Sequence, residues 1–181
     1  MSVQAPNRTS PASARKSGQM QVTQFSDYAV RTLMYCAVRR GQVCRVRDIA
    51  NAYRISEHHL MKVVQLLGQI GVIETLRGRG GGIRLAADPN EIVIGKVLRV
   101  TEGNLNLVEC FDPANSTCPL TPACRFHKAL LRALDAFFLV LDGYTLADFV
   151  LQPAELAQLL GLADQCPQAV PMDEETAIAA S

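Results

Sequence analysis

Long hydrophobic runs are missing from this chain of 181 residues. No apolar run reaches the roughly 18 residues that a membrane-spanning helix needs, so we expect no association with a membrane. The first 19 residues include basic side chains but no apolar segment, which argues against a secretory signal. We therefore expect a cytoplasmic protein.

Net charge is also nearly absent. The chain carries 18 Lys and Arg against 17 Asp and Glu, a formal charge of +1, which taken whole argues against a strongly basic nucleic-acid binder and against an acidic disordered chain. The charges are unevenly distributed, however. Residues 1–90 carry 13 basic and 5 acidic side chains, or +8, and residues 91–181 carry 5 and 12, or −7. This asymmetry indicates a basic part that binds an anionic partner, joined to a part with another role.

Signatures of catalysis are missing as well. The glycine-rich segment 77–82 is basic, but no helix opening with Lys-Ser or Lys-Thr follows it, so it is not a nucleotide phosphate-binding loop. The sequence also shows no Ser–His–Asp arrangement. We therefore predict that the protein is not an enzyme.

Hydrophobic periodicity predicts three helices and a hairpin within residues 20–90. They are helices at about residues 23–40, 46–53 and 56–70, and strands at about 72–76 and 83–85. Thr23 or Ser26 can cap the first helix, and Ser56 is a good N-cap for the third. This order is that of a winged helix-turn-helix. The predicted fold class is mainly α with a small β-hairpin wing and a long C-terminal dimerisation helix.

The winged-helix order also predicts which side chains meet DNA. A helix in the major groove presents its first turns to the bases, and a basic hairpin can follow the backbone into the minor groove. Arg54 stands in the turn before the third helix, where a left-handed conformation would cost an arginine about 1 kcal/mol. A charge-rich helix can also be simply a solvated face. The predicted contacts to double-stranded operator DNA are Arg31, Arg54, Ser56, Glu57, His58, His59, Lys62, Arg77, Arg79, Gly80, Gly81 and Arg84.

A second long helix is expected from Ala123 to Asp142. Its apolar residues recur at helical spacing, at Phe126, Leu130, Leu134, Phe137 and Leu141. Leu131 and Phe138 widen this stripe beyond what one small domain would cover, so we predict a partner helix from a second copy of the chain. After it, Thr145 and Asp148 resemble a capping pair that opens a short helix.

These patterns predict six regions. They are a disordered extension at 1–19, a DNA-binding domain at 20–90, a connecting helix at 91–103, a cluster-binding loop at 104–124, a dimerisation helix with a short C-terminal helix at 123–163, and a flexible tail at 164–181.

Six cysteines in a cytoplasmic chain indicate a metal, a cluster or free thiols rather than disulfides. Cys110, Cys118 and Cys124 fall in one loop at a C-x7-C-x5-C spacing, and the helix dipole favours a thiolate at Cys124. His127 lies one helical turn beyond Cys124 and faces the same way. Three soft ligands suit an iron–sulfur cluster or zinc, and the alternative is three unrelated thiols beside a capping histidine. No role is assigned to the others, Cys36, Cys44 and Cys166, of which Cys36 is expected in the core.

Four motifs together carry a family resemblance. They are MQVTQFSDYAVR at 20–31, RGRGGGIRL at 77–85, TPACR at 121–125 and GYTLAD at 143–148. Over about residues 20–160 the chain resembles the Rrf2 family of bacterial winged-helix repressors that carry iron–sulfur clusters, and among them the nitric-oxide-sensing members. The resemblance implies a homodimer in the bacterial cytoplasm, on the nucleoid when bound to DNA.

The resemblance also implies a set of cluster ligands. Cys110, Cys118 and Cys124 would hold the cluster, of the [4Fe–4S] type or alternatively [2Fe–2S]. In nitric-oxide-sensing members a carboxylate near the start of the first helix, from the other subunit, completes the set, and Asp27 stands at that place. In relatives that sense cluster supply a histidine three residues after the last cysteine does so, and His127 occupies that place. The Phe-Ser-Asp-Tyr context favours Asp27, although the helix dipole alone also favours a carboxylate there.

The resulting hypothesis is a repressor that leaves its operator when nitric oxide attacks the cluster. The main alternative is an iron- or redox-responsive regulator on the same fold, with His127 as the ligand. An iron–sulfur electron carrier and a zinc-stabilised DNA-binding protein remain further alternatives.

Overall fold

The structure is a computed structural model that describes residues 21–103 and 105–162. The extension expected at 1–19, the tail expected at 164–181 and Cys166 lie outside the described residues. In the part of the chain that the structure describes, no helix is both long enough and apolar enough to cross a bilayer.

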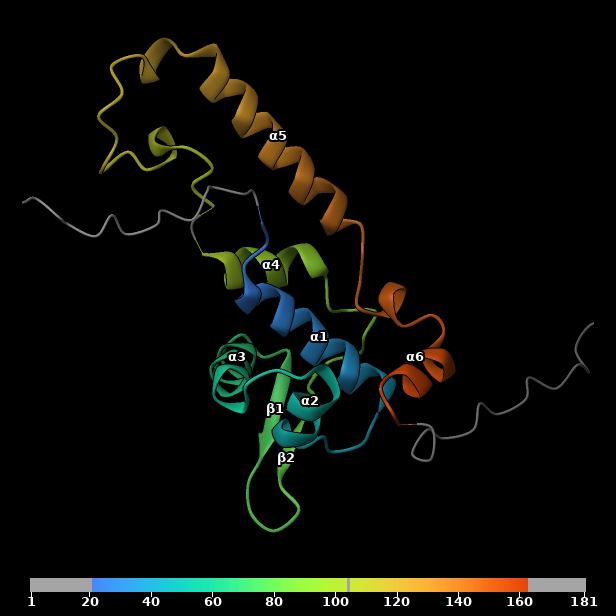
Figure 1. Cartoon of the computed structure of the whole chain (residues 1–181). Coiled ribbons are helices and arrows are strands. Elements are labelled where there is room, and N and C mark those ends of the chain that lie inside the picture. The colour runs from blue at the N-terminus through green and yellow to red at the C-terminus, as the bar shows by residue number, and fades with distance from the viewer. Residues whose placement is uncertain (1–20, 104, 163–181) are drawn as a thin grey trace, which may run out of the picture.

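Helix α1 (Gln24–Val38) lies at the centre of the molecule, between α4 (Ile94–Glu102) on one side and α2 (Val46–Tyr53) on the other (Figure 1). Its N-cap is Thr23, whose hydroxyl accepts a hydrogen bond from the Ser26 amide at 3.2 Å. The core closes around residues of α1 that are almost fully buried, such as Ala29, Leu33 and Tyr35. The predicted first helix is therefore present, and it ends at Val38 rather than at Arg40.

Helices α2 and α3 (Glu57–Gln69) form the helix-turn-helix, and strands β1 (Ile73–Leu76) and β2 (Gly82–Leu85) form the wing. The strands are antiparallel, with Ile73 opposite Leu85 and Thr75 opposite Ile83. Helix α3 buries one face through Leu60, Val63, Val64 and Leu67, as its periodicity predicts. A mainly helical fold with a two-stranded hairpin confirms the predicted fold class.

Helix α4 connects α1 to the long helix α5 (Arg125–Asp142). On the α1 side, the buried hydroxyls of Ser26 and Thr101 are 2.7 Å apart and hydrogen-bonded. On the α5 side, the Arg99 guanidinium donates to both carboxylate oxygens of Asp142, at 2.5 and 2.7 Å. Gly95 is required at this crossing, because a Cβ at Gly95 would collide with Asp142. Helix α4 therefore fixes α5 relative to the DNA-binding unit.

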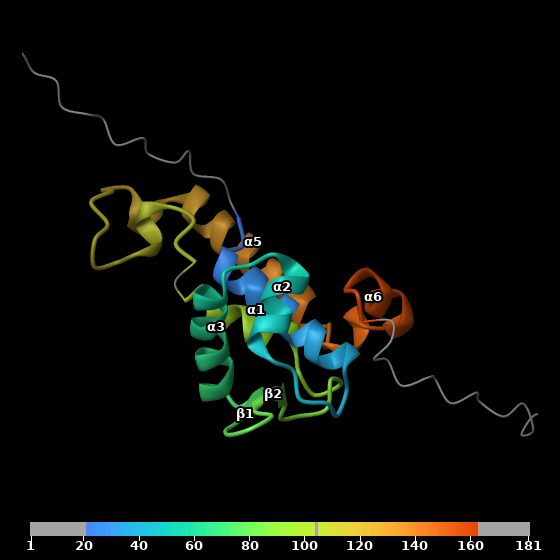
Figure 2. The same cartoon turned by 60° about the horizontal axis from the view of Figure 1, so that its bottom comes forward.

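Helix α5 begins at Arg125, two residues later than predicted, because residues Thr121–Ala123 form a separate 3-10 turn that contains Pro122 (η2). A further 3-10 turn, η1 (Glu109–Phe111), lies earlier in the loop. Figures 1 and 2 both show this loop and the start of α5 projecting from the body, at the end of the molecule far from the wing. The loop follows α4 in the chain and leads into α5, so both helices join it to the DNA-binding unit.

The chain then returns to the body through η3 (Ala147–Phe149) and α6 (Pro153–Leu159), which packs on α1. Thr145 and Asp148 form the expected capping pair: the Asp148 carboxylate accepts from the Thr145 amide at 2.7 Å and from its hydroxyl at 2.9 Å. These two hydrogen bonds lower the pKa of Asp148.

Candidate nucleic-acid interface and metal centre

The turn between α2 and α3 is held by an arginine in a left-handed conformation. Arg54 has φ 54° and ψ 44°, as its place in the turn predicts. Next in the chain, the Ile55 amide donates to the Ala50 carbonyl at 2.9 Å, which closes the end of α2. Because Arg54 is exposed, its charge lies on the surface beside the start of α3.

The first turns of α3 present polar side chains to solvent. Ser56 occupies the N-cap position, as predicted, in an extended conformation, but its side chain makes no capping hydrogen bond. Its hydroxyl is thus available to a ligand. The other predicted contacts of this helix, Glu57, His58, His59 and Lys62, are all exposed.

The structure adds two residues to this exposed face. Met61 is 52% exposed, although methionine is usually buried, and Gln65 lies one turn beyond it and is exposed as well. Methionine offers an apolar contact for a thymine methyl group, and glutamine can bond to adenine in the major groove. Their helical spacing from His58 and Lys62 was the signal in the sequence that could have identified them.

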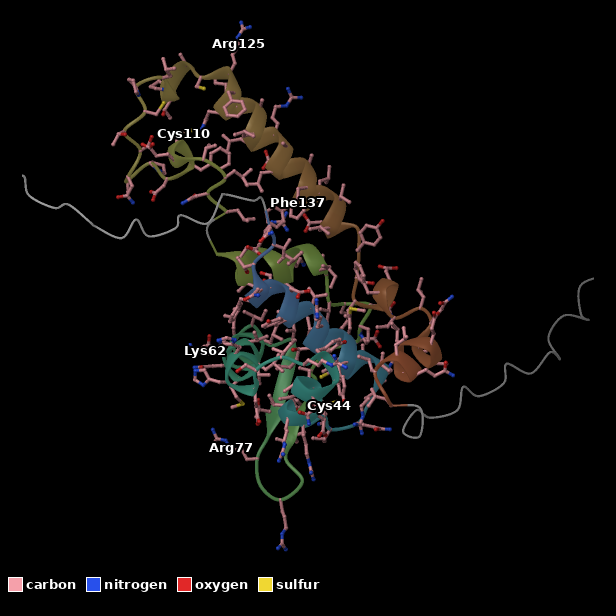
Figure 3. All side chains as sticks on the ribbon, in the orientation of Figure 1. Cys44, Lys62, Arg77, Cys110, Arg125 and Phe137 are labelled. Carbon is pink, nitrogen blue, oxygen red and sulfur yellow. The ribbon has the colours of Figure 1, made fainter. Side chains whose placement is uncertain are left out.

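The wing carries two arginines at its tip and one on a strand. Arg77 and Arg79 are exposed, and Figure 3 shows Arg77 on the same side of the molecule as Lys62 of α3. Gly81, also predicted to approach DNA, is needed for the tip itself, since a Cβ there would collide with the Leu76 carbonyl oxygen. Arg84 differs from the tip residues because it forms an ion pair with Glu74, its partner in the strand register. Its charge is therefore partly neutralised within the wing.

Two predicted site residues of different kinds contact each other. Arg31, predicted to bind DNA, donates from Nε to one Asp27 carboxylate oxygen and from Nη2 to the other, both at 2.9 Å. The Arg31 guanidinium also lies 5.7 Å from the centre of the Tyr53 ring. Burial raises the pKa of Tyr53 to about 12, so this tyrosine remains neutral. Asp27, predicted as a cluster ligand, is thus held by its own helix.

The loop cysteines are free and half-buried. Cys110 Sγ lies 3.1 Å from His127 Nδ1, and Cys124 Sγ accepts a hydrogen bond from the His127 amide at 3.4 Å. The Phe111 ring packs edge-on against the His127 imidazole, with 5.3 Å between ring centres. The structure therefore places the His127 imidazole against Cys110, whereas Cys124 contacts the backbone amide of His127.

Cys118 and Asp27 are not part of that group. Among the described residues, no three side chains of His, Cys, Asp or Glu converge in a way that could hold a metal ion. The donors nonetheless fit a soft metal in their chemistry, because three free thiols lie on one loop. The described residues of one chain thus supply the thiols but do not bring three ligands together.

The long spacing between the first two cysteines is taken up by a compact loop. Its two ends are joined by Glu109, whose carboxylate accepts from the Thr117 amide at 2.6 Å and from the Thr117 hydroxyl at 2.8 Å. These hydrogen bonds lower the pKa of Glu109. Between them, Asp112 accepts from the Ala114 amide at 3.1 Å and from the Asn115 side chain at 2.7 Å. Glu109 and Thr117 precede Cys110 and Cys118 directly, so these hydrogen bonds limit the distance between the two cysteines.

Helix α5 exposes much of its apolar surface. Phe126, Leu139 and Val140 are 65%, 73% and 61% exposed, respectively. A hollow of about 560 Å³ lies between α4, α5 and the loop, and Leu98, Leu130 and other apolar side chains line it. Phe138, expected to face a partner, is instead buried in its own chain, where Arg99 lies 4.3 Å above its ring. The exposed apolar side chains of α5 form the kind of surface that a partner protein covers.

The helix-turn-helix, the exposed face of α3 and the basic tip of the hairpin together define a winged-helix DNA-binding protein. A family model described as "Rrf2: Iron-dependent Transcriptional regulator" matches residues 22–152, and the chain belongs to this family. It is therefore a transcriptional regulator and not an enzyme.

Individual relatives agree with this assignment. The chain is 54% identical over 142 residues to the HTH-type transcriptional regulator NsrR of Geobacillus kaustophilus, covering 78% of this chain and 97% of the relative. Among solved structures it is similar to IscR of T. potens, with a TM-score of 0.58, 28% identity and coverage of 77% and 91%. It is also similar to CymR, the global cysteine regulator of B. subtilis, with a TM-score of 0.57, 26% identity and coverage of 72% and 96%.

Proposed function

We propose that the chain is a homodimeric repressor that binds operator DNA and responds to nitric oxide through an iron–sulfur cluster. The observation that carries this proposal is the set of three free cysteines on one loop, Cys110, Cys118 and Cys124, in a chain 54% identical to a regulator named NsrR. DNA binding would use the exposed polar face of α3 and the wing, whose tip presents the positive charges of Arg77 and Arg79. The protein would act in the bacterial cytoplasm.

The three cysteines would hold the cluster, of the [4Fe–4S] type, and Asp27 of a second subunit would complete it. When bound, the cluster would supply iron that reacts with nitric oxide, and an Asp27 oxygen is a poor match for that soft iron. Arg31 holds both oxygens of Asp27 within its own chain. Ligation of a partner's cluster by an Asp27 oxygen would compete with this ion pair and so weaken the hold on Arg31 beside the DNA-binding unit.

The described residues provide a route from the loop to the DNA-binding unit. The loop leads directly into α5, α5 is tied to α4 by Arg99 and Asp142, and α4 is tied to α1 by Ser26 and Thr101. A second chain on the exposed face of α5 would fix the spacing between two α3 helices, and half-site spacing on DNA depends on that distance. Release of the loop would loosen α5, change this spacing and lower affinity for the operator.

A second candidate function is an iron- or redox-responsive regulator with His127 as the fourth ligand. The contact of His127 Nδ1 with Cys110 Sγ favours it, because Asp27 makes no such contact within the described residues of one chain. The Asp27 proposal requires the second subunit, whereas the His127 proposal does not. Replacing each residue separately distinguishes them.

The experiment is an anaerobic absorption spectrum of the purified protein and of its Asp27→Ala and His127→Ala variants. We expect a brown wild-type protein whose spectrum changes in Asp27→Ala and persists in His127→Ala. The reverse pattern would establish the second candidate. Colourless protein that contains zinc would refute an iron–sulfur cluster in both forms.

A further inference from the structure

Two arginines that are not among the predicted DNA contacts lie at the start of α2, beside the wing. Arg45 is the N-cap residue of α2, Arg47 lies in its first turn, and both are exposed; together they are called the α2 arginine pair. The residue before them, Cys44, exchanges two backbone hydrogen bonds with Ile83 of β2, both at 2.8 Å. Figure 3 shows Cys44 next to the wing, at the same end of the molecule as Arg77. The backbone therefore holds the pair beside the base of the wing.

The α2 arginine pair differs from the neighbouring arginines because its charges are not neutralised. Arg40 forms an ion pair with Asp88. Arg84, next to Ile83 in the wing, forms one with Glu74. Within residues 21–103 and 105–162, neither guanidinium of the α2 pair has a hydrogen-bond or ion-pair partner. A ligand can therefore bind both guanidinium groups without breaking an existing ion pair.

Asp48 follows the pair directly, but it lies on another side of α2. Successive side chains of a helix point in directions about 100° apart. Asp48 lines a hollow together with Tyr35 and Arg39, so it lies toward the end of α1. Arg47 instead shares a side of α2 with Arg54, which follows it by seven residues, or two turns. The side of α2 that carries Arg47 thus runs from the base of the wing to a predicted DNA contact at the start of α3.

We propose that the α2 arginine pair binds phosphates of the DNA backbone beside the wing. This inference rests on the proposed binding of operator DNA, and it extends the predicted DNA surface onto α2. In a helix-turn-helix, the first helix crosses the backbone while the second lies in the major groove. The planar guanidinium of arginine binds phosphate oxygens with two parallel hydrogen bonds. Phosphate contacts carry no sequence information, so the pair contributes affinity and positions α3 and the wing without selecting bases.

The first test measures how the affinity depends on salt, by fluorescence anisotropy of the cluster-loaded protein on a duplex that it has selected from a random pool. In the double variant Arg45→Ala, Arg47→Ala, we expect the slope of log K against log salt to become shallower by about 0.9 for each lost contact, or about 1.8 per subunit. The variant should keep the wild-type Tm, because both side chains are exposed and Arg45 makes no capping hydrogen bond.

Two matched variants separate a phosphate contact from a general loss of charge. The double variant Arg45→Lys, Arg47→Lys keeps both charges and should retain the wild-type slope. The double variant Lys128→Ala, Arg132→Ala removes the same charge from exposed positions of α5, far from the wing, and should retain the slope as well.

A second test locates the contacts on the duplex. Neutral methylphosphonate groups replace single phosphates, one position at a time. We expect one or two positions in each half-site to weaken the wild type while leaving the double alanine variant unaffected, because this variant makes no contact there.

The inference is overturned if the double alanine variant keeps the wild-type slope, or if the α5 variant loses as much slope. It is also overturned if methylphosphonate weakens the wild type and the double alanine variant at the same positions. A wild type that binds no duplex at any salt concentration refutes the proposed function and the inference together. The failure of the inference alone is therefore distinguishable from the failure of the proposed function.

Discussion

Replacing Arg54 by glycine is predicted to stabilise the chain and to weaken its binding to DNA. Among the described residues, Arg54 is the one residue other than glycine that has a positive φ. A left-handed conformation costs such a residue about 1–2 kcal/mol, which glycine avoids. Glycine in turn lowers the stability by about 0.4–1 kcal/mol, because it gives the unfolded chain more conformational freedom. The exposed side chain contributes no core packing, so the difference of the two ranges leaves a net gain centred on about 0.8 kcal/mol. For a chain of this size that is a rise of about 1–4 °C in Tm.

The same substitution removes one positive charge from the predicted DNA surface. If Arg54 contacts a phosphate, the slope of log K against log salt becomes shallower by about 0.9 for each subunit. Thermal unfolding of the cluster-free protein at fixed concentration measures the first effect. Fluorescence anisotropy at several salt concentrations, with a duplex that the protein has selected from a random pool, measures the second.

Two controls separate strain from charge. Arg54→Ala keeps the left-handed strain and loses the charge, so it should reproduce the shallower salt slope without the gain in Tm. Arg54→Lys keeps both and should resemble the wild type. A Tm no higher in Arg54→Gly than in Arg54→Ala would refute the strain reasoning, and an unchanged salt slope would refute the phosphate contact.

Three further predictions concern the wing, the buried joint between α1 and α4, and the loop. Arg77→Ala should make the salt slope shallower by about 0.9 per subunit, and an unchanged slope would remove the wing tip from the interface. Thr101→Val removes the hydrogen bond of the buried Ser26 hydroxyl to Thr101 and leaves only its contact with the Thr23 hydroxyl at 3.3 Å. The variant should lower the free energy of unfolding by about 1–3 kcal/mol in a denaturant titration, whereas an unaltered midpoint would show that water replaces the bond. Glu109→Ala should speed amide hydrogen exchange at Thr117, and equal exchange in wild type and variant would show that the hydrogen bond does not persist in solution.

Local patterns predicted the helices well, because caps and periodicity act within a few residues. The helix expected at 46–53 has these bounds in the structure, and the connecting helix expected at 91–103 spans Ile94–Glu102. The left-handed turn at Arg54 was also predictable, since the position commonly requires glycine. The ion pair of Asp27 with Arg31 follows an i, i+4 pattern that the sequence displays, but both residues were assigned to other partners.

Contacts between segments far apart in the chain could not be predicted from the sequence. The hydrogen bond of Ser26 with Thr101 and the ion pair of Arg99 with Asp142 depend on how helices pack, which periodicity does not specify. Phe138 illustrates the same limit. The sequence placed Phe138 on the apolar face of the helix, which is correct, but Phe138 is buried beneath Arg99 of its own chain and does not face a partner.

The most direct test of the proposed function is an anaerobic titration of the selected duplex with cluster-loaded, nitric-oxide-treated and cluster-free protein. The proposal places the control of DNA affinity in the loop that carries Cys110, Cys118 and Cys124. It predicts tight binding by the loaded protein and much weaker binding after nitric oxide, with the same loss in Cys118→Ser, which lacks one loop thiol. Equal affinity in all forms would contradict it.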